Sequence, residues 1–288
     1  MNNPYKSLVD EYARLYREGS GLPLGNLPSV ALPAPSASGP SALIFSPHPD
    51  DEGIIGALAI RLQREHGWRI KNVAVTLGSH RARRAERLAE LRGACDYLGF
   101  DLIVPDPSGW EQVTPGGRTS DPAKWEAKVT AVVHLLRDQR PSALFYPHAD
   151  DWNGTHIGTH WLVMDALSRV GSDWSGFLVE TEFWGQMARP NLMVEVSASQ
   201  VADQVAGVSF HAGEVLRNPF HLRLPAWMQD NVRRGTELVG GQGGAAPSFD
   251  FATLYRLRSW RQGRVEELLP SGKAIPVGES TSALFEQV

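Results

Sequence analysis

Two loops of the sequence combine histidine with paired aspartates, and each loop comes directly after a hydrophobic run. Residues 46–51 read "SPHPDD" and follow the apolar run 42–45. Residues 147–156 read "PHADDWNGTH" and follow the apolar run 144–146. Adjacent carboxylates repel one another, so a solubilising turn does not explain either loop, whereas a bound cation does. If both runs are strands of one parallel sheet, both loops open at the edge where ligands bind in such folds.

The residue types in these loops predict a catalytic divalent metal site. Such a site commonly takes three protein ligands from histidine and carboxylate side chains and leaves a position open for water. His48 and Asp51 flank a turn whose proline ring fixes one backbone angle, so both can reach one ion. His156 from the second loop supplies the third ligand. Asp50 then lies beside the ion as a general base toward water. Zn²⁺ suits this ligand set, and Fe²⁺ suits it as well.

Hydrophobic runs alternate with helical segments through the middle of the chain. This alternation predicts right-handed crossovers and a largely parallel sheet. The near-continuous apolar runs fit strands that are covered on both faces. We therefore predict a doubly wound α/β domain of Rossmann-like topology. The expected strands are 42–47, 69–77, 100–105, 142–147 and 176–184, and the expected helices are 53–68, 83–99, 124–139 and 159–171.

The two ends of the chain follow this pattern less closely. Residues 4–18 have apolar positions at helical spacing, and a Pro/Ser-rich connector follows them. Residues 1–40 are therefore expected to form an irregular N-terminal extension packed on the domain. Residues 41–288 are expected to form a single catalytic domain, with weaker patterning after about residue 190. The weaker signals are helical spacing at 205–216, a glycine-rich loop at 240–244 and a late strand at 251–263.

The composition excludes several classes of protein. The 288 residues are 42% hydrophobic, enough for a sizeable core, and the formal net charge is −4. This charge provides no electrostatic attraction to nucleic acid or to anionic membranes. Cys95 is the one cysteine, which excludes an intrachain disulfide and a thiolate metal cage. No apolar stretch approaches the roughly 18 residues of a membrane helix, and no secretion signal is recognisable, so a cytoplasmic protein is expected.

Three segments resemble the PIG-L/LmbE-like de-N-acetylases. They are "PHPDDEGIIGA", "VAVTLG" and "RLAELRGACDYLG", and the resemblance extends from about residue 42 to residue 160. It implies a zinc-dependent hydrolase with His48, Asp51 and His156 as ligands and Asp50 as general base. The helix motif of the family is matched at Arg87, Glu90, Ala94, Leu98 and Gly99, and a further histidine of its second motif is matched at His160.

One position departs from the family motif. Asn153 stands where the family has a histidine, to which the resemblance assigns polarisation of the amide carbonyl or protonation of the tetrahedral intermediate. Asn153 can donate a hydrogen bond to an oxyanion, but it cannot transfer a proton. His148, His80 and His160 are the candidates for that transfer, and the sequence does not distinguish between them.

The expected activity is removal of an N-acetyl or other acyl group from an N-acylated amino-sugar conjugate, such as an N-acetylglucosamine derivative. Asp50 and Asn153 are the expected catalytic residues, and homo-oligomerisation is left open. A metal-dependent hydratase or lyase on the same scaffold, and a non-catalytic sugar-binding module, are the alternatives. The expected substrate-binding residues are Arg87, His80, His160 and Trp152, the last because an aromatic face can stack on a sugar ring.

Overall fold

The computed structural model describes residues 3–31 and 39–286. Parts of the predicted N-terminal extension (1–2 and 32–38) and the last two residues of the predicted catalytic domain lie outside the described residues. The helices are α1 (Lys6–Gly19), α2 (Asp51–Ile54), α3 (Ala57–His66), α4 (Arg84–Leu98), α5 (Pro115–Ser120), α6 (Pro122–Gln139), α7 (Gly154–Val170), α8 (Ala198–Ser209), α9 (Ala212–Arg217) and α10 (Leu224–Leu238). The strands are β1 (Ser41–Ser46), β2 (Arg69–Ala74), β3 (Asp101–Ile103), β4 (Ala143–Pro147), β5 (Gly176–Thr181), β6 (Leu192–Glu195), β7 (Ala252–Arg261), β8 (Arg264–Glu267) and β9 (Lys273–Ile275).

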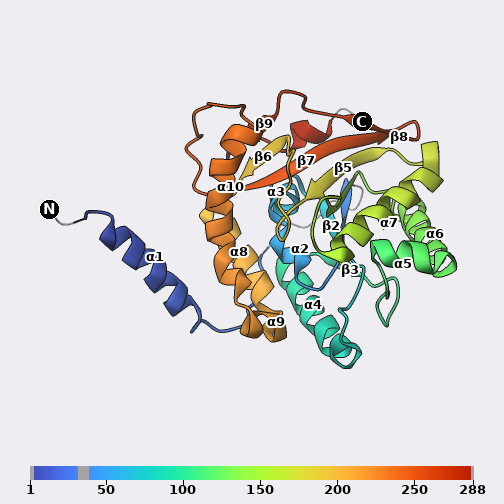
Figure 1. Cartoon of the computed structure of the whole chain (residues 1–288), viewed down its shortest axis with the longest axis horizontal. Coiled ribbons are helices and arrows are strands. Elements are labelled where there is room, and N and C mark those ends of the chain that lie inside the picture. The colour runs from blue at the N-terminus through green and yellow to red at the C-terminus, as the bar shows by residue number, and fades with distance from the viewer. Residues whose placement is uncertain (1–2, 32–38, 287–288) are drawn as a thin grey trace.

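The strands form one mixed, mostly parallel sheet in the order β3-β2-β1-β4-β5-β7-β6-β9, with β8 paired to β7 (Figure 1). Strands β1 to β5 pair in parallel with one another, and each of the five was predicted from its apolar run. Helices cover both faces of this sheet, so the prediction of a doubly wound α/β fold is confirmed.

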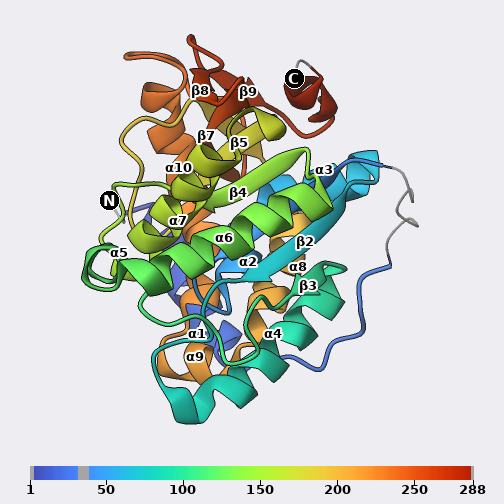
Figure 2. The same cartoon turned by 90° about the vertical axis from the view of Figure 1, so that its right-hand side faces the viewer.

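The central strand β1 contributes side chains to a core on each face of the sheet. Ala42 and Ile44 pack in one hydrophobic cluster with residues of α3, α4 and α8. Leu43 and Phe45 alternate with them and pack in the other cluster with residues of α6 and α7. In Figure 2, α6 and α7 lie in front of the sheet and α8 lies behind it. Burial on both faces explains why β1 is apolar at every core position.

The strand order places a crevice between β1 and β4. From β1 the chain adds β2 and then β3 toward one edge of the sheet. It then returns to the other side of β1 in the strand order and adds β4 and β5 toward the opposite edge. Parallel strands leave a crevice at their carboxyl ends where the order reverses in this way. The two acidic loops follow β1 and β4 directly, so they meet at this crevice.

The helix expected at 53–68 is interrupted, so that prediction is wrong in the middle of the segment. Helix α2 ends at Ile54 and α3 begins at Ala57. The Tyr255 hydroxyl from β7 donates to the carbonyl of Ile55 (3.1 Å) and accepts the backbone N–H of Leu58 (3.0 Å). A side chain inserted between backbone groups in this way replaces bonds that a continuous helix would make. Tyr255 is almost fully buried, so the interruption belongs to the packed core.

The last third of the chain extends the sheet beyond β5. The predicted late strand is present as β7, and it pairs antiparallel with β5, from Gly176 opposite Trp260 to Thr181 opposite Tyr255. Strand β6 also pairs antiparallel with β7, and β9 is parallel to β6. The helical spacing at 205–216 corresponds to the end of α8 and to α9, with a break at Phe210 and His211. The short strands β6, β8 and β9 were not predicted.

Helix α1 extends away from the rest of the molecule (Figure 1). It contacts the domain where the Tyr12 hydroxyl donates to Gln229 (2.9 Å) and where the Arg223 guanidinium lies 3.6 Å from the Tyr16 ring centre. Helix α1 therefore contacts the domain along one side. After it, Leu24, Leu27 and Val30 pack against the core, and the N–H of Val30 donates to the carbonyl of Tyr97 (3.1 Å). All residues of α1 are described, and none is buried. The large apolar side chains that it leaves exposed are Leu8, Val9, Tyr12 and Leu15. Within the described ranges, no helix combines the length and apolar character needed to cross a membrane.

Candidate metal centre

The loops after β1 and β4 bring His48, Asp51 and His156 together. The two strands are neighbours in register, with Ala42 opposite Ala143 and Ile44 opposite Phe145. One ligand atom from each of the three side chains lies within 4.8 Å of the other two. The set that the spacing predicted as metal ligands therefore converges at the edge of the sheet.

The turn around Pro49 orients the first two of these residues. An oxygen of Asp51, Oδ2, accepts the backbone N–H of His48 at 2.8 Å and lies 3.5 Å from His48 Nδ1. Asp51 is the first residue of α2 and is almost fully buried, whereas 22% of the His48 side chain is exposed. The short loop thus presents one imidazole and one carboxylate to the same point.

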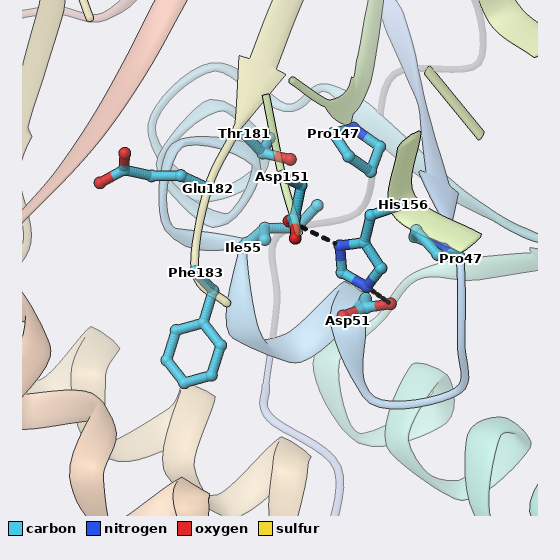
Figure 3. A pocket seen from close by; sticks show the side chains of 9 residues that line it. All are labelled: Pro47, Asp51, Ile55, Pro147, Asp151, His156, Thr181, Glu182 and Phe183. Atoms are coloured by element: carbon cyan, nitrogen blue, oxygen red, sulfur yellow. Dashed lines mark ion pairs between the residues drawn. The ribbon is translucent and has the colours of Figure 1, made fainter. Parts of the chain in front are cut away.

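The imidazole of His156 lies between two carboxylates (Figure 3). Its Nδ1 is 3.2 Å from Asp151 Oδ2, and its Nε2 is 3.4 Å from Asp51 Oδ2. Nε2 is buried and makes no hydrogen bond within the described part of the chain. If Nδ1–H donates to Asp151, the lone pair of Nε2 faces the carboxylate oxygen of Asp51. Two such electron pairs repel each other unless a cation lies between them.

The electrostatics of the three residues fit a dication. Burial acts to raise the pKa of Asp51, but His156 and His48 outweigh it and lower that pKa. Burial acts to lower the pKa of His156, but Asp51 and Asp151 outweigh it and raise that pKa to about 10. The negative charges of Asp51 and Asp151 therefore stabilise a positive charge on the His156 imidazole. Two imidazole nitrogens and a carboxylate oxygen form a donor set that suits Zn²⁺ or Fe²⁺, so His48, Asp51 and His156 could hold a metal.

Two residues of this triad, Asp51 and His156, border a small cavity of about 10 Å³. Asp51, Asp151 and His156 form its polar side, and in Figure 3 the Glu182 side chain points away from it. A volume of this size accommodates about one water molecule. The remaining lining residues are Pro47, Ile55, Pro147, Thr181, Glu182 and Phe183.

Asp50 lies next to the triad in an uncommon backbone conformation. Its φ is 121° and its ψ is −31°, and only 6% of the residue is exposed. Its Oδ2 lies 3.5 Å from Arg87 Nη2. Burial and then the charge of Asp51 raise the pKa of Asp50, while Arg87 opposes this rise. Asp50 is therefore a buried carboxylate next in sequence to Asp51 that is not one of the three convergent residues, and its role as a general base stays a prediction.

Arg87 and His80 differ in their surroundings, although both were expected to bind substrate. The Arg87 guanidinium donates to the carbonyl of Pro49 (2.8 Å) and faces Asp50, so it supports the first loop. His80 is exposed in the segment between β2 and α4. The structure therefore places Arg87 behind Asp50 and His80 at the surface.

Asn153 is the N-cap of α7. Its side-chain oxygen accepts the backbone N–H of Thr155 (2.9 Å), and its own N–H donates to Asp151 Oδ1 (2.8 Å). These bonds start the helix that carries His156 on its first turn. Because the side-chain oxygen is occupied by the cap, the amide nitrogen is the group of Asn153 that can donate to an oxyanion.

The ring nitrogens of the two other candidate histidines contact the backbone. His148 Nε2 lies 2.9 Å from the carbonyl of Gly185, and His148 Nδ1 accepts the N–H of Asp150 (3.2 Å). The proton of the neutral ring therefore lies on Nε2, and neither nitrogen is free. His160 Nδ1 lies 3.0 Å from the carbonyl of Pro147. Both histidines thus stabilise the second loop through contacts to its backbone or to the backbone next to it.

Below pH 6.5, the buried His160 is expected to reduce the stability of the protein. Burial lowers its pKa to about 4, against 6.5 for an ordinary histidine. The unfolded chain therefore binds this proton more tightly, so the stability contribution is complete above pH 6.5 and is lost as the pH falls toward 4. The loss at pH 4 amounts to about 3 kcal/mol.

His160→Asn tests this expectation, because its amide nitrogen can still donate to the Pro147 carbonyl but does not titrate. We expect urea unfolding at pH 7 and pH 4.5 to show a smaller acid-induced loss in the variant than in the wild-type protein. Equal losses in the two proteins would contradict the assignment.

The tryptophans near the strand ends have different roles. Trp152 is 70% exposed, and its indole N–H donates to the carbonyl of Trp184 (2.9 Å), which fixes the ring at the surface beside the second loop. Trp110 is 8% exposed and belongs to the core on the α6 and α7 face. Trp184 packs against Phe183 and Phe220, with ring centres 4.9 and 5.3 Å apart.

Three residues contribute to the site although the sequence analysis gave them no role. Asp151 contacts His156, and Glu52 contacts both the backbone of Asp50 and the side chain of His211. The adjacency of Asp151 and Glu52 to the two motifs was a usable signal for them. No local signal pairs His211 with a loop 159 residues earlier.

Comparison with known families supports the resemblance seen in the sequence. Residues 43–167 match the family model described as PIG-L: GlcNAc-PI de-N-acetylase. This range includes most of β1, all of β4, Asp50 and all three residues of the triad. No curated protein sequence matches the chain.

Several solved structures have a similar fold. A conserved protein from Thermus thermophilus superposes with a TM-score of 0.56 at 17% identity, covering 75% of this chain and 93% of that one. N,N'-diacetylchitobiose deacetylase from Pyrococcus horikoshii has a TM-score of 0.56 at 15% identity, covering 91% and 94%. GalB, the 4-carboxy-2-hydroxymuconate hydratase from Pseudomonas putida, has a TM-score of 0.54 at 16% identity, covering 76% and 95%. At these identities the likeness shows the fold alone, and the second of these structures extends it over most of the C-terminal region.

Proposed function

We propose that this chain, whose residues 43–167 match the PIG-L family model, is a metal-dependent hydrolase that removes an acyl group, most simply acetyl, from an N-acylated amino-sugar conjugate. One observation carries the proposal. The triad of His48, Asp51 and His156 converges at the crevice between β1 and β4, and a second carboxylate that is not one of the three, Asp50, is next to Asp51 in the chain.

The residues divide the work of amide hydrolysis between them. His48, Asp51 and His156 would hold the cation. A bound divalent cation supplies Lewis acidity, which lowers the pKa of water and polarises a carbonyl group. Asp50 accepts the proton of the attacking water as the new carbon–oxygen bond forms. Asn153 donates from its amide nitrogen toward the developing oxyanion.

The second half of the reaction breaks the carbon–nitrogen bond. The acyl group leaves as a carboxylate, and the amine must receive a proton. His148 has both ring nitrogens bonded to the backbone. Asp50, which holds the proton taken from water, is therefore the group that we propose returns it to the leaving nitrogen.

The substrate class rests on the family and on the surroundings of the site. The matched family model is described as a de-N-acetylase of an N-acetylglucosamine conjugate, and the exposed ring of Trp152 beside the second loop offers a face for a sugar. The net charge of −4 does not favour a polyanionic substrate.

The direct test is acetate release from a panel of N-acetylglucosamine conjugates by the zinc-loaded protein. We expect release by the loaded protein, none after chelator treatment, and recovery when zinc is restored. A panel without release, from protein that binds one equivalent of zinc, would contradict the deacetylase proposal.

A hydratase is the second candidate, and Asn153 is the observation that favours it. Addition of water to an activated double bond needs no protonated amine, and Asn153 cannot transfer a proton. Loss of ultraviolet absorbance from conjugated enone acids, with no acetate release from the sugar panel, would favour this activity. A sugar-binding protein without catalysis would bind the conjugates and convert neither class.

A further inference from the structure

The backbone of Asp50 adopts a conformation that an ordinary residue avoids. With φ at 121° and ψ at −31°, it lies in the region that favours glycine. A non-glycine residue stays there only when its surroundings hold it. The chain on either side of Asp50 is short, because β1 ends at Ser46 and α2 begins at Asp51.

The Glu52 carboxylate binds this strained peptide from one side. Its Oε2 accepts the backbone N–H of Asp50 at 3.0 Å. Its Oε1 lies 2.7 Å from Nε2 of His211. The side chains of Glu52 and His211 are both 0% exposed. One buried carboxylate therefore connects the Asp50 peptide to a histidine from the C-terminal region.

The elements around His211 hold it firmly against the first loop. His211 lies between α8 and α9, and its backbone N–H donates to the carbonyl of Val208 (3.1 Å). Helix α8 packs on α2, where Gln204 donates to the carbonyl of Gly53 (3.0 Å). A Cβ at Gly53 would lie 2.8 Å from Val208 Cγ2, so the two helices are in close contact.

From these contacts we infer that Glu52 and His211 are positioning residues that hold the strained backbone of Asp50 and thereby aim its carboxylate at the reacting atoms. The inference rests on the proposed role of Asp50 as general base. The competing explanation is a buried pair that stabilises the fold and has no effect on Asp50.

Substitutions at His211 separate these explanations. His211→Gln can still donate from its amide nitrogen to Glu52, whereas His211→Asn is one methylene shorter and cannot reach it. His221→Asn is the matched control, since His221 is also buried, comes from the same region and has no ion pair within the described residues. All variants are measured as zinc-loaded full-length protein with the best substrate of the acetate panel.

We expect His211→Asn to lower kcat about 10- to 100-fold, the range seen when a supporting partner of a catalytic group is removed. The KM and the zinc content should change little, and His211→Gln and His221→Asn should keep kcat within a few-fold of wild type. In an Asp50→Asn background, His211→Asn should have almost no further effect, because both changes act on one group. Equal kcat values for His211→Asn and wild type, equal losses in the Asn and Gln variants, or multiplying effects with Asp50→Asn would overturn the inference.

A structural measurement keeps the inference testable if the proposed function itself fails. Crystal structures of the His211→Asn and His211→Gln variants would show the backbone angles of residue 50. Relaxation of φ out of the positive range in the Asn variant, with retention in the Gln variant, would support the positioning role without any assay. An unchanged φ in both variants would refute it, whatever the panel of substrates shows.

Discussion

Asp50→Asn is expected to lower kcat for acetate release by about 10²- to 10⁴-fold, the usual contribution of a general base. The amide is nearly isosteric with the carboxylate but cannot accept a proton from water. Asp50 faces Arg87 across 3.5 Å and is not one of the three convergent ligand residues. The variant should therefore bind zinc with the stoichiometry of the wild-type protein, as measured by elemental analysis.

The second loop offers a matched control for this substitution. Asp150 occupies the same place after β4 as Asp50 does after β1, one residue before Asp151, but it is exposed. Asp150→Asn should leave kcat within a few-fold of wild type. A full loss of activity in Asp150→Asn, or wild-type kcat in Asp50→Asn, would remove Asp50 from the mechanism.

Asp51→Asn is expected to produce the largest loss of metal affinity. Asp51 Oδ2 lies 3.5 Å from His48 Nδ1 and 3.4 Å from His156 Nε2, and it supplies the negative charge between the two imidazoles. We expect zinc affinity to fall well beyond the roughly 10- to 100-fold range that follows loss of an outer partner. Competition with a fluorescent zinc chelator measures the dissociation constant directly.

Asp151→Asn is expected to cause a smaller loss of zinc affinity than Asp51→Asn. Asp151 lies 3.2 Å from Nδ1 of His156, on the far side of the ring from Asp51, and orients it as carboxylates commonly orient metal-bound histidines. Its replacement should weaken zinc binding by about 10- to 100-fold. Equal losses from Asp51→Asn and Asp151→Asn, or tight binding in both variants, would be inconsistent with the ligand set proposed here.

Much of the fold was predictable because its signals are local. The strands β1 and β4 are continuous apolar runs, and the helices between them have helical spacing, which leads to parallel pairing through crossovers. The interruption between α2 and α3 was not predictable in this way. It depends on the Tyr255 hydroxyl, which reaches Ile55 from 200 residues away in the chain.

By itself, the sequence determined that two loops with histidines and aspartates follow buried strands, and it thereby predicted the convergence of His48, Asp51 and His156. Their binding of a metal and the role of Asp50 as a base stay predictions. The tertiary structure alone decided which partners support these residues: Asp151 behind His156, and Glu52 with His211 behind Asp50. It also decided that β7 enters the sheet antiparallel beside β5. Periodicity reports how a segment is buried, whereas contacts across 159 residues depend on how the whole chain packs.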